Sequence, residues 1–135
     1  MKNVCYKCGS TNHVRETKSK YVRKSGEVTT YSTYKCKKCS DEFAKKHYDR
    51  CKAIVFDHYG GLCVCCGEKT QEFLTIDHVN NDGHSEVYQS NGRRITGIQL
   101  YARIVKARFP LKYQLMCMNC NFGKRMNGGI CPHEV

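Results

Sequence analysis

The sequence lacks any long hydrophobic run. Its apolar stretches are only a few residues long, whereas a membrane-spanning helix needs about 20 apolar residues, so we expect no membrane partner. No low-complexity tract is visible, and no internal repeat beyond recurring C-x-x-C pairs. Met1-Lys2-Asn3-Val4-Cys5 leads straight into a cysteine pair, so we also expect no secretory signal.

Acidic residues are scarce, with 12 Asp and Glu against 23 Lys and Arg and a formal net charge of +11. Two four-thiolate zinc sites, each contributing about −2, would leave roughly +7. Residues 1–50 carry 13 basic against 5 acidic residues, so this part is the stronger candidate for non-specific contact with a polyanion. The alternative is a basic face that only keeps the chain soluble.

Cysteine is abundant, with eleven in 135 residues. Small modules bury too little apolar surface to fold securely without metals or disulfides. The odd total and the paired spacing favour two four-thiolate zinc sites over disulfides, and therefore a reducing, cytoplasmic compartment. The expected ligand sets are Cys5, Cys8, Cys36 and Cys39 for the first site and Cys63, Cys66, Cys117 and Cys120 for the second.

Three cysteines remain outside these pairs. Cys65 is one residue out of the C-x-x-C register, and we interpret it and Cys51 as packed thiols. Cys131-Pro132-His133 offers a C-x-H pair that could complete a zinc site if one paired thiolate is not used. The regular spacing of the two pairs favours the four-thiolate set.

The pattern predicts a small, zinc-stabilised α+β fold. Residues 1–40 are typical of a zinc ribbon, with strands at 14–20 and 28–35 and a turn at 24–27. On this hairpin Tyr21, Tyr31 and Tyr34 alternate with basic residues, which could combine base or sugar packing with phosphate contacts. The alternative is that the tyrosines fill a small core. The basic residues are Arg15, Lys18, Lys20, Arg23 and Lys24.

Residues 41–60 predict a connecting helix that begins at Asp41 and ends at Gly60-Gly61. The expected inner face comprises Phe43, His47, Cys51, Ile54, Val55 and His58. Residues 61–135 form a second module. Its expected elements are a strand at 73–79, a turn at 80–83, a helix at 98–108, a strand at 113–116 and a helix at 118–127.

Closure of the second zinc site would bring Asp77 and His78 close to Asn121. A carboxylate, an imidazole and an amide in a basic protein indicate metal-assisted cleavage of a phosphodiester. Neighbouring strand residues face opposite sides, so the strand must end or bend at the 80–83 turn. The alternatives are a turn-entry carboxylate beside a packed histidine, and helix capping by Asn121.

The second module resembles the HNH nuclease superfamily and its ββα-metal core, in the zinc-containing variant found in phage and homing-type nucleases. The resemblance rests on Cys63-x-x-Cys66-Gly67, on Leu74-Thr75-Ile76-Asp77-His78, and on Leu115-Met116-Cys117-x-x-Cys120-Asn121-x-x-Lys124. It implies a magnesium-dependent DNA endonuclease (manganese being an alternative metal), with Asp77 and Asn121 as metal ligands and His78 as general base. It further implies double-stranded DNA as substrate, a monomer or homodimer, and a phage-encoded or bacterial cytoplasmic protein.

Two positions depart from the family pattern. Lys112 stands where the middle Asn is usual, and Asn121 stands where the family often has His. Asn80, Asn81 or Gln114 could replace the middle Asn.

His84 is a candidate metal ligand or phosphate contact, or else an exposed loop residue. The residues expected to contact nucleic acid are Lys18, Lys20, Arg23, Lys24, Lys124 and Arg125. A non-catalytic zinc protein that binds nucleic acid, and a protein directed at RNA, are the alternative functions.

Overall fold

The structure is a computed structural model that describes residues 4–11, 14–86, 92, 95 and 97–134. The chain divides into two compact units, residues 1–47 and 48–135. Within the described residues the fold is small α+β, with three α-helices and two antiparallel sheets of two strands each. This confirms the α+β part of the predicted fold class.

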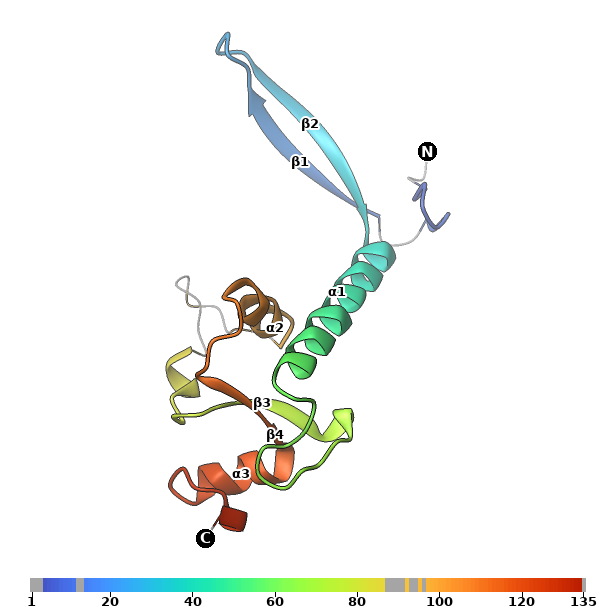
Figure 1. Ribbon diagram of the computed structural model, residues 1–135. Helices are drawn as coiled ribbons and strands as arrows, with labels where there is room; N and C mark the ends of the chain where they lie inside the picture. The colour runs from blue at the N-terminus through green and yellow to red at the C-terminus, as the bar shows by residue number, and fades with distance from the viewer. Residues whose placement is uncertain (1–3, 12–13, 87–91, 93–94, 96, 135) are drawn as a thin grey trace. The chain divides into compact units, whose positions relative to one another are not determined.

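The first unit contains a long hairpin of β1 (Val14–Val22) and β2 (Val28–Cys36), visible in Figure 1. The register runs from Val14 opposite Cys36 to Val22 opposite Val28. Both strands are rich in Val, Thr and Tyr, whose side chains suit a pleated ribbon. Gly26, at φ 84°, supplies the turn, and the Arg23 N–H donates to the Glu27 carbonyl at 2.9 Å. The predicted hairpin is confirmed.

The helix α1 (Lys37–His58) begins directly after β2, rather than at Asp41. It ends at Gly60-Gly61 as predicted, where the Gly61 N–H donates to the Phe56 carbonyl at 2.8 Å. The prediction of its inner face is only partly right. Cys51 and Val55 are buried, but so is Phe56, whereas Phe43 is 74% exposed.

The second unit is built on β3 (Leu74–His78) and β4 (Tyr113–Cys117), which pair from Leu74 opposite Cys117 to His78 opposite Tyr113. The helix α3 (Met118–Met126) follows β4 directly and contacts both strands. The helix α2 (Gly97–Lys106) precedes β4. Short 3-10 helices lie at Gln71–Phe73, Gly83–Glu86 and Pro132–Glu134. These elements match the predicted order.

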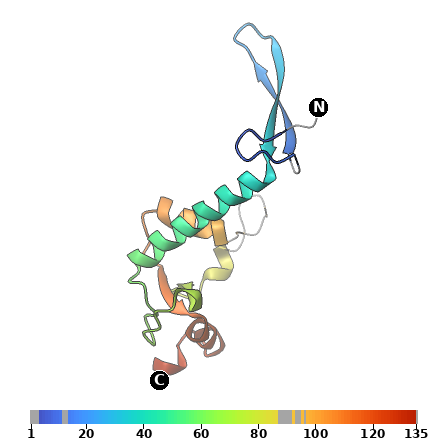
Figure 2. The ribbon, with the colours of Figure 1, turned by 90° about the vertical axis from the view of Figure 1, so that its right-hand side faces the viewer.

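The core of this unit lies between the sheet, α2 and the C-terminal part of α1. Its fully buried side chains include Phe56, Ile104, Leu115 and Met116. The Tyr101 ring of α2 makes edge contacts with Tyr48 and Phe56 of α1, at 5.5 and 6.0 Å between centroids. Figure 2 shows α2 beside this part of α1. Among the described residues, no helix has both the length and the apolar character needed to cross a membrane.

Candidate functional site

The first candidate metal centre is the cluster of Cys5, Cys8, Cys36 and Cys39, whose sulfurs all lie within 4.8 Å of one another. The Cys5–Cys39 and Cys8–Cys36 sulfurs are 3.8 and 3.6 Å apart. Four sulfurs at about 2.3 Å from a tetrahedral zinc ion stand about 3.8 Å from each other. The cluster predicted from the spacing is confirmed as one that could hold zinc.

The second centre is built in the same way from Cys63, Cys66, Cys117 and Cys120, again with all sulfurs within 4.8 Å. The Cys66 and Cys117 sulfurs are 3.7 Å apart. This cluster also could hold zinc, as predicted.

Both centres combine a tight loop with a strand–helix junction. In the loops, the N–H of Gly9 donates to Cys5 O at 2.8 Å and that of Gly67 to Cys63 O at 2.9 Å. Both glycines have positive φ, 68° and 77°. The other two ligands are the last residue of a strand and a residue in the first helical turn. These pairs are Cys36 with Cys39, and Cys117 with Cys120.

The surroundings of the two clusters act unequally on their thiols. Backbone N–H groups of Cys8 and Lys7 lower the pKa of the Cys5 thiol to about 7. Burial opposes ionisation of Cys63, but the N–H groups of Cys66, Cys117 and Cys65 bring its pKa down to about 7. Hydrogen bonding to Cys8 and burial raise the pKa of Cys39 to about 12. Zinc bound by these sulfurs would displace the protons that the thiols still carry.

A third cluster was not predicted in this form. Cys65, Cys120, Cys131 and His133 have their ligand atoms within 4.8 Å of one another. Cys65 is half-buried and packs against the core, as predicted, but it also belongs to this cluster. The alternative role of Cys131 and His133 as zinc ligands gains a geometric basis. Cys51 is buried in the core, as expected, and belongs to none of the clusters found among the described residues.

The three residues singled out for catalysis line one cavity of about 680 Å³. Asp77 and His78 reach it from the end of β3, and Asn121 from the first turns of α3. The bend required after His78 is present, because the Asn81 N–H donates back to the His78 carbonyl at 3.0 Å and Asn81 adopts φ 57°. The rest of the lining comprises Ile76, Asn81, Gly83, His84, Arg125, Gly128 and Gly129.

The Asp77 carboxylate is buried and paired. Its Oδ2 accepts from the Lys124 ammonium at 2.6 Å and from the Gln114 amide at 2.7 Å. Lys124 also donates to the carbonyls of His78 and Val79, at 2.9 and 3.1 Å. Lys124 is only 5% exposed, so it holds the end of β3 in place. This role differs from the expected phosphate contact, because an ammonium group buried to this degree cannot reach a phosphate.

The support of the β3 end comes from two other positions. Among the candidates for the missing middle Asn, it is Gln114 that contacts Asp77. At Lys112 the backbone provides the support, since its carbonyl accepts from the Val79 N–H at 2.9 Å. The Lys112 ammonium lies over the Tyr113 ring, 5.2 Å from its centroid.

The imidazole of His78 is held between Tyr113 and Gly83. The Tyr113 ring meets it edge-on at 4.9 Å between centroids. A Cβ placed at Gly83 would lie 2.7 Å from His78 Nδ1, so only glycine fits without displacing the ring. The glycine was visible in the sequence as a turn residue, but nothing there indicated its contact with His78.

Among the described side chains of the two strands, Lys18 and Lys20 lie on a different face from Tyr21 and Tyr31. Lys18 and Lys20 lie opposite Ser32 and Thr30, whereas Tyr31 lies opposite Ser19. Because side chains alternate along a strand, the two lysines occupy one face, and Tyr21 and Tyr31 the other. The tyrosines are 58% and 49% exposed, so they do not fill a core. The side chains of Arg15 and Tyr34 are outside the described residues.

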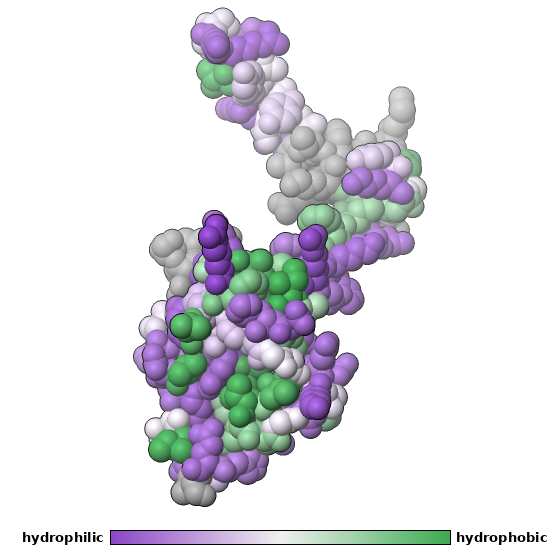
Figure 3. All heavy atoms as spheres, viewed as in Figure 1, coloured by the Kyte–Doolittle hydropathy of each residue, from purple (hydrophilic) through white to green (hydrophobic). Residues whose placement is uncertain are grey.

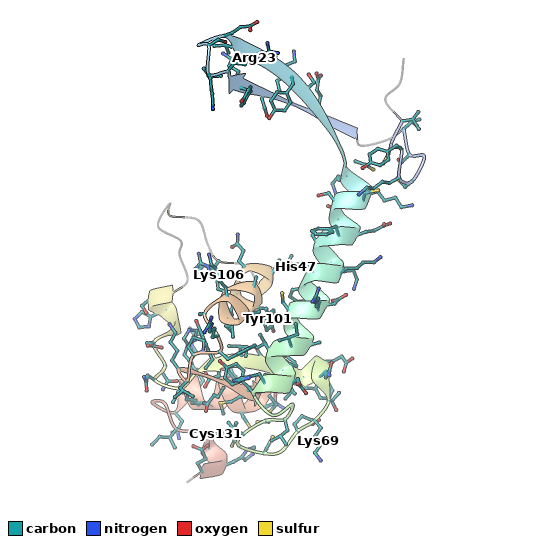
Figure 4. All side chains as sticks on the ribbon, turned by 45° about the horizontal axis from the view of Figure 1, so that its top comes forward. Arg23, His47, Lys69, Tyr101, Lys106 and Cys131 are labelled. Atoms are coloured by element: carbon teal, nitrogen blue, oxygen red, sulfur yellow. The ribbon has the colours of Figure 1, made fainter. Side chains whose placement is uncertain are left out.

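Figure 3 shows hydrophilic residues at the tip of the hairpin, with an apolar patch beside them. Arg23 and Lys24 are exposed there, and Figure 4 shows Arg23 at the far end of the hairpin. Arg23 forms an exposed ion pair with Glu27 at 3.1 Å, which leaves it a weakly held charge that another anion could compete for.

Comparison with known proteins adds no assignment. No protein-family model matches the chain, and no curated protein or solved structure matches it either.

Proposed function

We propose that this protein is a metal-dependent DNA endonuclease of the HNH type, which hydrolyses phosphodiester bonds in the cavity at the end of β3. The observation that carries the proposal is the convergence of Asp77, His78 and Asn121 on one cavity. These side chains come from positions 44 residues apart in the sequence, and a strand–helix junction beside a cysteine cluster brings them together.

The donor set suits a hard divalent cation. Among the described contacts, both hydrogen bonds to the Asp77 carboxylate are made to Oδ2, which leaves Oδ1 as an available oxygen. Asp77 Oδ1 and the Asn121 amide oxygen would hold a magnesium or manganese ion together with water. Such an ion would stabilise the negative charge that develops on the leaving 3′ oxygen, so that hydrolysis of the phosphodiester gives a 3′-hydroxyl end.

The remaining roles belong to the chain's own groups. His78, fixed between Tyr113 and Gly83, takes the proton of the attacking water, a contribution typically worth on the order of 10²–10⁴ in rate. Arg125 and His84 line the same cavity and offer positive charge or hydrogen bonds to the phosphate. Lys124 and Gln114 position Asp77 without contacting the substrate.

The hairpin serves as the DNA-binding arm in this proposal. Lys18, Lys20, Arg23 and Lys24 are all exposed, and contacts of this kind bind phosphates without regard to sequence. The lysine face would follow the backbone. Tyr21 and Tyr31, on the opposite face, have no part in that role.

One observation favours a second function, a zinc protein that binds nucleic acid without cutting it. The Lys124 ammonium lies 2.6 Å from Asp77 and neutralises the charge that a catalytic metal would use. In a pure binding protein, such an ion pair would simply fix the β3 end.

A plasmid-nicking assay distinguishes the two functions. The zinc-loaded chain is incubated with supercoiled plasmid in magnesium, in manganese and in EDTA, and binding is followed in parallel by gel shift. Nicking that requires the divalent metal supports the endonuclease. Binding without cleavage under either metal would establish the second function, and an RNA duplex in a further lane tests the nature of the sugar.

A further inference from the structure

Two of the three metal-competent clusters found among the described residues share Cys120. We propose that the second unit holds two zinc ions bridged by the Cys120 thiolate. One ion is ligated by Cys63, Cys66, Cys117 and Cys120, and the other by Cys65, Cys120, Cys131 and His133. The chain would then bind three zinc ions in all, including the one at the base of the hairpin.

The distances fit a second tetrahedral ion. His133 Nδ1 lies 3.4 Å from Cys120 Sγ, 3.8 Å from Cys65 Sγ and 3.9 Å from Cys131 Sγ. For zinc–sulfur and zinc–nitrogen bonds of about 2.3 and 2.0 Å, a tetrahedral site places nitrogen and sulfur about 3.5 Å apart. Two ions that share one sulfur lie at most about 4.6 Å from each other.

The net charge favours a centre with two bridged zinc ions over a centre with one zinc ion bound by either of the two ligand sets. A four-thiolate site with one zinc ion carries about −2 and leaves two further thiols and an imidazole beside it. Six thiolates with two zinc ions also carry about −2, since the imidazole is neutral. The second ion therefore adds ligand bonds without adding net charge to the centre.

The C-terminal ligands reach the site because the segment that carries them packs closely against α3. After α3 the chain reverses at Gly128-Gly129, where the Gly129 N–H donates to the Lys124 carbonyl at 2.8 Å. A Cβ at Gly123 would lie 2.9 Å from Pro132 Cδ, so a glycine on α3 lets the Cys131–His133 segment pack against the helix. Cys131 is fully buried there, in the segment after α3 (Figure 4).

The second ion would also fix one wall of the cavity. That wall includes Asn121, Arg125, Gly128 and Gly129, and its chain segment lies between Cys120 and Cys131. Both ends of the segment are ligands of the proposed ion. This inference does not rest on the nuclease activity, because it concerns metal content alone.

Native mass spectrometry of the zinc-loaded chain tests the proposal. We expect three zinc ions per chain, and two for His133→Ala, whose side chain is exposed and therefore tolerates truncation. The matched control is His47→Ala, an exposed histidine on α1 outside the clusters, which should keep three. Two ions in the unmodified chain, or three in His133→Ala, would overturn the bridged centre.

Cadmium NMR gives a second readout that does not depend on a variant. After exchange of zinc for ¹¹³Cd, two of three resonances should correlate with the same Cys120 β protons. Three resonances with no shared cysteine, or only two resonances, would contradict a bridging thiolate.

Discussion

At the scale of single residues, Asp77 is defined by its neighbours. A buried carboxylate is tolerated because an ammonium and an amide satisfy the same oxygen. The sequence showed Lys124 three residues after Asn121, and a lysine near a helix end is normally exposed. Its burial follows from the contact of α3 with β3, a long-range feature that local sequence does not contain.

Removal of the Lys124 ammonium should strongly destabilise the second unit. Lys124→Met leaves an uncompensated buried carboxylate, which typically costs about 3–5 kcal/mol. Urea unfolding of the zinc-loaded chain, followed by circular dichroism, measures this decrease in stability. Adding Asp77→Asn to the variant should recover part of it, and a cost below about 1 kcal/mol for Lys124→Met would show that the ion pair contributes little.

The contact between Gly83 and His78 gives a second prediction. Gly83→Ala should displace the imidazole and lower the cleavage rate by roughly 10²-fold, the usual effect of a misplacement of about 1 Å. Gly97→Ala is the matched control, because its Cβ would lie at an ordinary 3.8 Å from the Tyr48 ring. An unchanged single-turnover rate in Gly83→Ala would show that the contact does not position His78.

At the scale of secondary-structure elements, both units use one layout of a cysteine loop, two antiparallel strands and a helix. The C-x-x-C spacing predicts which cysteines cluster, because it brings two sulfurs together both in a tight loop and at the junction of a strand and a helix. It does not distinguish these two forms, so the predicted start of α1 is too late. The grouping of Cys65, Cys131 and His133 escaped prediction because the chain reversal after α3 brings them together.

The helix α1 carries two cysteines with different expected roles, one a zinc ligand and the other a thiol packed in the core. The Cys39→Ser variant should bind one zinc ion fewer, and the circular dichroism signal of the folded hairpin should be lost. The reason is that structural zinc supplies on the order of 10–16 kcal/mol in small metal-folded peptides. Cys51→Ser, on the same helix but within the core, should keep its full zinc content. Equal zinc content in both variants would mean that Cys39 is not a ligand.

The lysine face of the hairpin should appear in the salt dependence of DNA binding. Lys18→Ala combined with Lys20→Ala should weaken binding to any sequence and reduce the slope of log K against log salt by about 1.8, or roughly 0.9 for each phosphate that a lysine no longer neutralises. Lys69→Ala with Lys106→Ala removes two exposed charges of the second unit (Figure 4) and should leave the slope unchanged. Equal slopes for the two double variants would exclude the hairpin as the arm.

At the scale of the whole molecule, a basic chain with few acidic residues combines cysteine clusters that could hold zinc with a cavity that gathers Asp77, His78 and Asn121. The order of the elements and the identity of these three residues followed from motif spacing. Their surroundings followed only in part. Gln114 was one of three candidates, and sheet register selects it. Lys124 and Gly83 contact Asp77 and His78 only through the packing of α3 and the turn after β3.

The central claim is tested most directly by the cleavage rate of a 5′-labelled DNA duplex in magnesium, for the native chain, for His78→Ala and for His47→Ala. The account predicts 5′-phosphate and 3′-hydroxyl ends, a decrease of about 10²–10⁴-fold in His78→Ala, and a full rate in the His47→Ala control, with equal DNA binding by all three. Undiminished cleavage by His78→Ala, or no cleavage by the native chain, would contradict it.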